Sequence, residues 1–283
     1  DGNRIVTGGN DLLINIWDAA TLTLQQRKDV SGKIVDIAAV RDVDDLFVIG
    51  DNNQRVALLE LGGEITLREV GSLRYPLTGV AASPDGVLIA AGDLNGGIAI
   101  WDVGSEKVRE VKRPANYVLG DTAHLGSPGS PHSLSFSSDG RLVFSGLHNG
   151  IIRSLDSTSG MDTQQNLLLN AHVKKMGLSH DSRHLITQQD NNTLSMWDLQ
   201  TGTVRYQIQG ELKSGIVFSQ DDTRFAIASA GISPAMVMVH DTESGSEVHS
   251  IRSQPGLKTV QFINKDTQLI GVYETFVELW SMS

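Results

Sequence analysis

The sequence predicts an all-β fold in which one small antiparallel sheet is repeated seven times along the 283-residue chain. Three observations support this prediction. A short alternating apolar run recurs at a nearly constant interval, a turn-forming cluster precedes each run, and a second turn follows it. Alternation with a period of two residues, bounded by Gly, Asp, Ser and Pro, is typical of half-buried strands rather than of helices.

The recurring run ends in Trp-Asp or in a close variant, and this ending sets the period. The equivalent positions along the chain are Trp17, Leu59, Trp101, Leu155, Trp197, His240 and Trp280. The intervals between them are 42, 42, 54, 42, 43 and 40 residues. Because five of the six intervals are close to one value, the sequence predicts seven equivalent structural units.

Each unit also has a turn upstream of the run, such as "SPDG" at 83–86, and a turn downstream of it, such as "LQTG" at 199–202. With a strand on either side of each turn, a unit contains four antiparallel strands, here named a, b, c and d, and the Trp-Asp pair ends strand c. One such sheet cannot bury both of its faces alone. We therefore expect the units to pack radially as the blades of a seven-bladed β-propeller.

This unit resembles the repeat of the WD-repeat β-propeller family, and the resemblance covers essentially the whole chain. It implies a platform for protein partners without catalytic activity. It also implies that an Asp of the b–c turn braces each blade through hydrogen bonds with His, Ser or Thr and Trp; this chain has Asp or Asn at that position. The matching structural residues are Thr7, Asp11, Trp17, Asn95, Trp101, Asn149, Thr187, Asn191, Trp197 and Trp280. The Gly-His dipeptide of the family is missing, so we expect no blade to have the complete bracing network.

Both ends of the chain fall inside a repeat. Asp1 and Gly2 stand before Trp17 as Asp85 and Gly86 stand before Trp101, so we expect the first blade to lack strand a. The sequence ends three residues after Trp280, so we expect the last blade to lack strand d. We interpret the chain as one propeller domain, residues 1–283, from a longer protein. An upstream segment of that protein, or a partner, would complete the seam.

Composition excludes several classes of function. The chain has no cysteine, which excludes disulfides, zinc–thiolate sites and thiol catalysis. Its net charge of −10 argues against nucleic-acid binding, and no apolar run is long enough to be inserted into a membrane. We expect a cytoplasmic location, with the periplasm as the alternative.

Catalytic and cofactor motifs are missing as well. The sequence has no phosphate-binding glycine loop, nucleophile elbow or HExxH pattern. His180 and His184 have the spacing of zinc ligands, but they flank a turn and have no second ligand pair nearby. We therefore expect no enzyme activity, no cofactor and no metal. The alternatives are a sensor propeller that binds a small ligand or peptide in the central channel, and an enzyme or redox propeller.

The long interval points to a binding element. Its extra residues fall between strand d of blade three and strand a of blade four, at 113–133. In a propeller the d–a and b–c connections share one rim, here called the top rim, and the a–b and c–d turns share the bottom rim. Large side chains with polar tips often anchor interfaces, so we expect a protein partner to bind the top rim. The residues selected are Arg113, Tyr117, Leu119, His124 and His132. A tolerated surface loop is the alternative.

Overall fold

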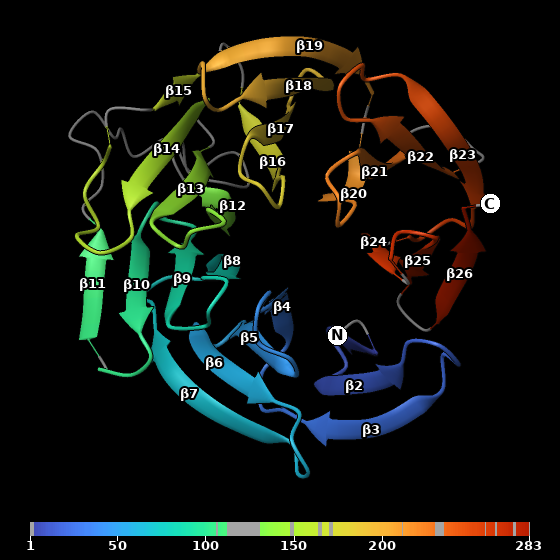
Figure 1. Ribbon diagram of the computed structural model, residues 1–283. Coiled ribbons are helices and arrows are strands. Elements are labelled where there is room, and N and C mark those ends of the chain that lie inside the picture. The colour runs from blue at the N-terminus through green and yellow to red at the C-terminus, as the bar shows by residue number, and fades with distance from the viewer. Residues whose placement is uncertain are drawn as a thin grey trace. The chain divides into compact units, whose positions relative to one another are not determined.

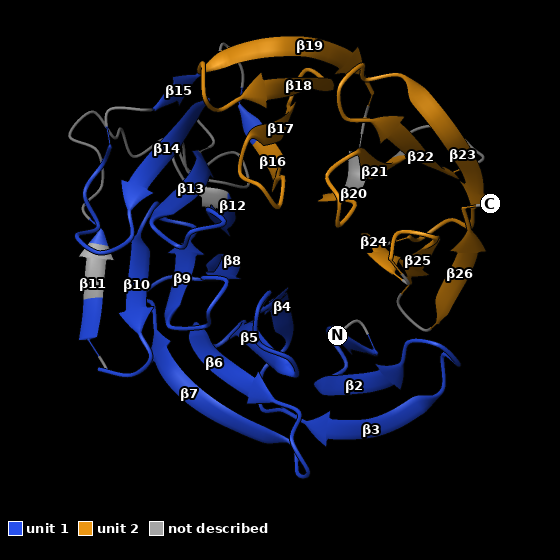
Figure 2. Cartoon of the chain, in the orientation of Figure 1, with its two compact units in different colours: residues 1, 3–173 blue, residues 2, 174–283 orange. Residues whose placement is uncertain are grey.

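The computed structural model describes residues 3–105, 107–111, 131–147, 150–163, 166–169, 172–210, 212–229, 235–257, 259–263, 265–273 and 276–282. Every regular element in these ranges is a strand, and the strands form seven antiparallel sheets that follow one another along the chain (Figure 1). The predicted all-β fold, a seven-bladed β-propeller, is confirmed. The chain divides into two compact units, with residues 3–173 in unit 1 and residues 174–283 in unit 2 (Figure 2).

Unit 1 contains blades one to four. Its strands are β1 (Arg4–Gly8), β2 (Leu13–Asp18), β3 (Leu24–Asp29), β4 (Ile34–Ala39), β5 (Leu46–Asp51), β6 (Arg55–Glu60), β7 (Thr66–Ser72), β8 (Leu77–Ala82), β9 (Leu88–Asp93), β10 (Ile98–Asp102), β11 (Lys107–Val111), β12 (Pro131–Phe136), β13 (Leu142–Leu147), β14 (Ile151–Asp156) and β15 (Leu167–Leu168). Each strand pairs with its neighbours in the chain, so the blades are simple meanders.

Unit 2 contains blades five to seven, and strand β16 begins at the boundary between the units. The strands are β16 (Val173–Leu178), β17 (His184–Gln189), β18 (Thr193–Asp198), β19 (Thr203–Gln209), β20 (Leu212–Phe218), β21 (Arg224–Ser229), β22 (Ala235–Asp241), β23 (Glu247–Ser253), β24 (Thr259–Ile263), β25 (Gln268–Val272) and β26 (Val277–Ser281). The seven tryptophan-equivalent positions all lie on the strand c of their blade.

The first and last sheets have three strands among the described residues, whereas the other five have four. Trp17 lies in β2 and Trp280 lies in β26, which identifies both strands as strand c. Blade one therefore consists of strands b, c and d, and blade seven consists of strands a, b and c, as the repeat spacing predicts.

The a–b turns are held by a recurring pair of side-chain hydrogen bonds. Ser83 Oγ donates to Asp85 Oδ1 at 2.6 Å and accepts from the amide of Leu88 at 2.9 Å. The same two bonds recur in the turns that begin at Ser137, Ser179 and Ser219. The residue three positions after each serine has a positive φ; these residues are Gly86, Gly140, Ser182 and Asp222. The repeat therefore fixes the path of the chain at the bottom rim.

The hydrophobic core lies between neighbouring blades of each unit. In unit 1 one cluster joins blades two and three through Val48, Val80 and Trp101. In unit 2 another joins blades five and six through Met196 and Phe225. Because a blade buries both faces against its neighbours, the central strands carry apolar side chains on both faces. Contact between blades therefore contributes much of the free energy of unfolding.

Candidate partner-binding site

Two tryptophans of strand c are tied to strand b of the same blade. Trp17 Nε1 donates to Thr7 Oγ1 at 2.9 Å, and Trp197 Nε1 donates to Thr187 Oγ1 at 3.1 Å. The second bond is buried, and the first is partly buried. Because these side chains are engaged inside the sheet, they brace the blade and offer no reactive group to a ligand.

Side-chain oxygens cap the b–c turns. Asp11 Oδ1 accepts from the amide of Leu13 at 3.3 Å, and Asn191 Oδ1 accepts from the amide of Thr193 at 3.1 Å. Such bonds let a short polar side chain replace a backbone partner in a tight turn. Asn149, the corresponding residue of blade four, lies outside the described residues.

In blades two and three the turn acceptor is an aspartate that the sequence analysis missed. Asp93 Oδ1 accepts from the amides of Asn95 and Gly97 at 2.9 and 2.8 Å, so Asn95 contributes a backbone donor. Asp51 occupies the same place in blade two, and its Oδ2 also accepts from Arg55 Nε at 2.9 Å. The signal was present as an aspartate two residues before the asparagine, in "DNN" and "DLN".

The other tryptophans of strand c pack against glycine backbone. Trp101 is 3% exposed and Trp280 is 9% exposed. A Cβ added at Gly71 would lie 2.3 Å from Trp101 Nε1, and one added at Gly271 would lie 2.2 Å from the Trp280 ring. Only glycine leaves room for such a close approach. Trp101 is therefore buried against β7 of the neighbouring blade, and Trp280 is buried against β25 of its own blade.

The two histidines with zinc-like spacing contact neighbouring side chains instead. His180 Nδ1 lies 2.9 Å from Asp222 Oδ1. His184 Nε2 accepts from Arg205 at 2.8 Å, and Arg205 also forms an ion pair with Glu243. Across the described residues, no group of three His, Cys, Asp or Glu side chains is placed to bind a metal ion. The contacts of these groups join blades five and six.

Blade four departs from the other blades at its outer strand. Strand β15 has two residues, and Arg153 of β14 forms a double contact with Asp162 in the segment before it, with both N–O distances at 2.7 Å. Arg153 is 2% exposed, and a buried guanidinium needs a partner of this kind. This ion pair joins β14 to the segment before β15, beside an isolated bridge between Leu155 and Asp162.

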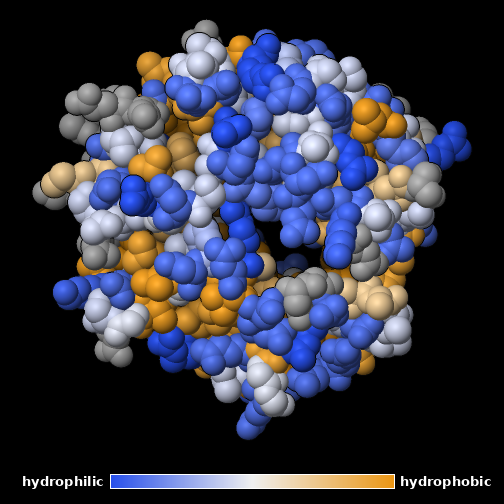
Figure 3. Space-filling view, viewed as in Figure 1, coloured by the Kyte–Doolittle hydropathy of each residue, from blue (hydrophilic) through white to orange (hydrophobic). Residues whose placement is uncertain are grey.

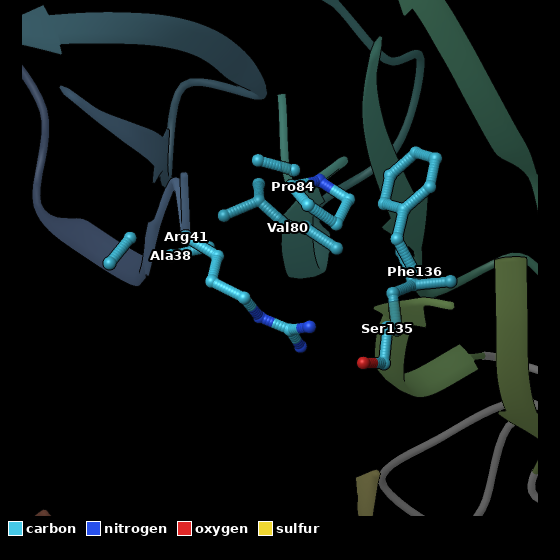
Figure 4. Close-up of a pocket in the computed structure, with 10 residues that line it drawn as sticks. Ala38, Arg41, Val80, Pro84, Ser135 and Phe136 are labelled. Carbon is cyan, nitrogen blue, oxygen red and sulfur yellow. The ribbon is translucent and has the colours of Figure 1, made fainter. Parts of the chain in front are cut away.

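A cavity of about 170 Å³ lies in unit 1, at the a–b ends of the adjacent strands β4, β8 and β12 (Figure 4). Much of its wall consists of small side chains, namely Ala38, Ala39, Ala81 and Ala82. Pro84 and Phe136 form buried apolar parts of the wall. Because four of the lining residues are alanines, the three strand ends leave a hollow that is open on one side to solvent.

Two polar side chains face this cavity. Arg41 extends from the turn after β4, and its guanidinium points across the cavity toward the hydroxyl group of Ser135 on β12 (Figure 4). Arg41 is exposed, and Ser135 is half-buried. Among the described residues of the lining, Arg41 is the one that carries a charge. The arrangement offers a planar cationic donor and a hydroxyl donor beside an apolar wall, which suits a ligand group with acceptor oxygens.

The residues selected from the sequence are not among the described residues that line the cavity. Arg113, Tyr117, Leu119 and His124 are outside the described residues, and of His132 only the backbone, in β12, is described. Their contact with a partner stays a prediction. The cavity lies at the a–b ends of β4, β8 and β12, on the bottom rim, which the sequence analysis had not selected.

The surface in view is mainly polar. Figure 3 shows hydrophilic side chains over most of it, with hydrophobic residues gathered near β9 and β10. Large apolar side chains that are exposed occur on several blades, for example Val87 at 47% and Met161 at 71%. Single exposed apolar residues are normal on folded proteins and do not by themselves mark an interface. In the described part of the chain, no helix has the length and apolar character to cross a membrane.

Comparison with known proteins identifies the class. The family described as "WD domain, G-beta repeat" matches residues 68–102, which run from β7 to the end of β10. This match spans strand d of one blade and strands a, b and c of the next. Together with the seven strands c that recur at one period, the match confirms the resemblance to the WD-repeat β-propeller family.

Three curated relatives are similar over most of the chain. WD repeat-containing protein 90 of Xenopus tropicalis is 28% identical over 241 residues, which are 80% of this chain and 13% of the relative. The human protein of the same name is 25% identical over 297 residues, 99% of this chain and 16% of the relative. Apoptotic protease-activating factor 1 of Rattus norvegicus is 24% identical over 246 residues, which are 81% of this chain and 17% of the relative. The chain thus spans less than a fifth of each relative.

Proposed function

We propose that this chain is a non-catalytic platform that binds a protein partner, the role that WD-repeat propellers generally have. The observation that carries the proposal is the cavity of unit 1, whose lining includes one charged side chain, Arg41. A single guanidinium can anchor a group of a partner. Catalysis would need a nucleophile with its base, or an acid and a base at matched positions.

The size of the cavity supports a protein partner over a small-molecule sensor. Sites for metabolites and cofactors usually enclose about 300–1,000 Å³. The cavity here has about 170 Å³, which suits one side chain of a docked protein. The main partner surface would then include the bottom rim of blades two to four.

Three expectations from the sequence complete the proposal. The segment 113–133 at the top rim would supply a second contact with a partner. An upstream segment of the same protein would pair with the outer edge of β26 and complete blade seven. The protein would act in the cytoplasm.

Site-specific photo-crosslinking tests the proposal. A photoreactive residue would be placed in the full-length protein, in its source cell, at Ala39 beside the cavity or at Tyr117 in the top-rim segment. The matched control is Arg68, an exposed residue on the outer strand β7. We expect a discrete protein adduct from position 39 or 117 and none from position 68. If neither position yields a protein adduct, the platform proposal is wrong.

A further inference from the structure

A second cavity of unit 1, of about 140 Å³, lies between blades one and two. Its wall includes the connection from β3 to β4, the b–c turn of blade two and strands β5, β6 and β7. The apolar part of this wall consists of Val30, Ile34, Ile49, Ala57 and Leu67. Both connections belong to the top rim, where the sequence predicts contact with a partner. We call this space the blade-two cavity.

The blade-two cavity corresponds to a place that an indole ring covers in other blades. In blades one and five, the tryptophan of strand c reaches a threonine of strand b, two residues beyond the residue with which the tryptophan pairs. In blade two, Leu59 stands at the tryptophan position and pairs with Phe47, so Ile49 stands at the threonine position. Ile49 and its pairing partner Ala57 both line the cavity. Because leucine is smaller than tryptophan, the replacement leaves a hollow on this face of the sheet.

The described lining has three charged side chains, and two of them neutralise each other. Arg55 donates from Nε and Nη2 to Asp51 Oδ2 at 2.9 and 2.6 Å, and Nη2 also donates to Ser31 Oγ. Glu69 of β7 is exposed, and none of the described residues forms an ion pair or a hydrogen bond with its carboxylate. Glu69 pairs with Ala57 across the strands, so its side chain stands on the cavity face. The blade-two cavity therefore has one uncompensated negative charge beside apolar walls.

The connection that covers this cavity is fixed to the b–c turn of blade two. Asn52 Oδ1 accepts from the amide of Lys33 at 2.7 Å. A Cβ added at Gly32 would lie 2.6 Å from Asp51 Oδ2, so the backbone passes close to the carboxylate that holds the turn. A wall that is held in place before binding lowers the entropic cost of association.

We infer that the blade-two cavity binds a basic side chain, Lys or Arg, of the protein partner, with Glu69 as its anchor. The inference rests on the proposed function and names a specific contact at the top rim. The aliphatic part of such a side chain can pack on Ile49 and Ala57, while its cationic group pairs with the carboxylate. The net charge of the chain is −10, so the overall field also attracts a basic partner.

The test is a selection from a library of random short peptides on the purified chain, followed by affinity measurements. Selected peptides should carry Lys or Arg at one fixed position, and its change to Met should weaken binding about tenfold. Glu69→Gln keeps the size of the side chain and should weaken binding by the same factor. The two changes combined should cause no further loss, because both remove the same ion pair.

Filling the cavity tests the hollow itself. The double variant Ile49→Thr and Leu59→Trp introduces the pair that blades one and five have, and the new indole should occupy the space of the docked side chain. Binding of the selected peptides should fall about tenfold or more, while circular dichroism shows a folded chain. A folded double variant with full affinity would overturn the inference. If this variant does not fold, the Glu69 variants decide the question alone.

Charge reversal gives the sharpest outcome. On Glu69→Lys the selected position should change from basic to acidic residues. The matched control Glu64→Lys makes the same charge change on the c–d turn of blade two, at an exposed residue outside the cavity lining, and should keep the basic preference. No enriched peptide, a preference for another residue type, or full affinity in Glu69→Gln would overturn the inference. A protein adduct at position 39 or 117 together with full affinity in Glu69→Gln would leave the platform proposal standing while this inference fails.

Discussion

Asp222 of blade six holds the a–b turn of blade five through three hydrogen bonds. Its Oδ1 lies 2.7 Å from the amide nitrogen of His180 and 2.9 Å from His180 Nδ1, and its Oδ2 accepts from the amide of Asp181 at 2.8 Å. Asp222 has a φ of 58°, a conformation that costs a residue other than glycine about 1 kcal/mol. Asp266 repeats the contact one blade further on, with Gln220. Turn-to-turn contacts therefore join the blades of unit 2 in addition to the packing of their sheets.

Replacing Asp222 should weaken the contact between blades five and six. In Asp222→Asn the side-chain NH₂ replaces one acceptor oxygen, while asparagine still tolerates the positive φ. We expect the free energy of unfolding to fall by about 1–3 kcal/mol, measured by urea unfolding. Asp222→Gly, which introduces the residue of blades three and four, should also destabilise, but by less because it relieves the backbone strain. Unchanged unfolding in both variants would show that the contact contributes nothing.

The same contact should depend on pH in a defined direction. Burial, the largest single influence, raises the pKa of Asp222, but the hydrogen bonds from His180 and Asp181 outweigh it and hold that pKa below the ordinary value of 3.8. A carboxyl group with a lowered folded-state pKa stabilises the fold above its unfolded-state pKa. It loses this effect as the pH falls through the folded value. The stability difference between wild type and Asp222→Asn should therefore be constant at neutral pH and shrink below about pH 4. Denaturant unfolding of both proteins across this pH range measures the stability difference. A difference that grows toward acid pH would contradict the prediction.

The two Trp–Thr bonds should differ in their contribution. Thr187→Val leaves the buried indole N–H of Trp197 without its acceptor, so we expect a loss of about 1–3 kcal/mol in unfolding free energy. Thr7→Val removes the equivalent bond to Trp17, which is only partly buried. Water can replace the lost acceptor there, so the loss should be smaller. Thermal or urea unfolding of the two variants measures both losses in unfolding free energy. Equal losses would show that burial of the indole N–H does not determine the loss.

A close packing contact between blades five and six gives a further prediction. A Cβ at Gly245 would lie 2.5 Å from the ring of Tyr206, and Gly245 has a φ of +71°. Gly256 has a φ of +93° but no neighbour that a Cβ would meet. Gly245→Ala should therefore lower the free energy of unfolding by about 1–3 kcal/mol more than Gly256→Ala does. Both variants strain the backbone, but only Gly245→Ala also causes a steric clash. If the two variants unfold alike, the contact with Tyr206 has no energetic weight.

The blades were predictable because each copy repeats the same local signals. Even His240, which replaces tryptophan, lies on strand c and stacks on Phe225 with ring centroids 5.1 Å apart. The capping aspartates Asp51 and Asp93 were within reach of the sequence, since turn chemistry is local. In blade three, Asn95 was selected in place of Asp93, two residues earlier in the same turn.

Contacts between blades were not predictable in this way. Asp222 binds a backbone amide 42 residues earlier in the chain, and nothing in "SQDD" distinguishes that role from a local turn. The pairing of Arg153 with Asp162 depends on the interruption of an outer strand. The cavity beside Arg41 depends on three strand ends lying side by side, which a one-dimensional repeat does not specify.

We propose separate roles for the residues that hold the blades, such as Thr187, and for Arg41, which would contact the partner. The most direct measurement of this separation is calorimetric titration. The protein that cross-links at position 39 is titrated into wild type, Arg41→Gln and Thr187→Val. The thermal unfolding of each of the three proteins is measured in parallel. Arg41→Gln should weaken binding about tenfold or more with an unchanged melting temperature. Thr187→Val should lower the melting temperature and leave the affinity of the folded protein unchanged. Equal affinities for wild type and Arg41→Gln would contradict the account.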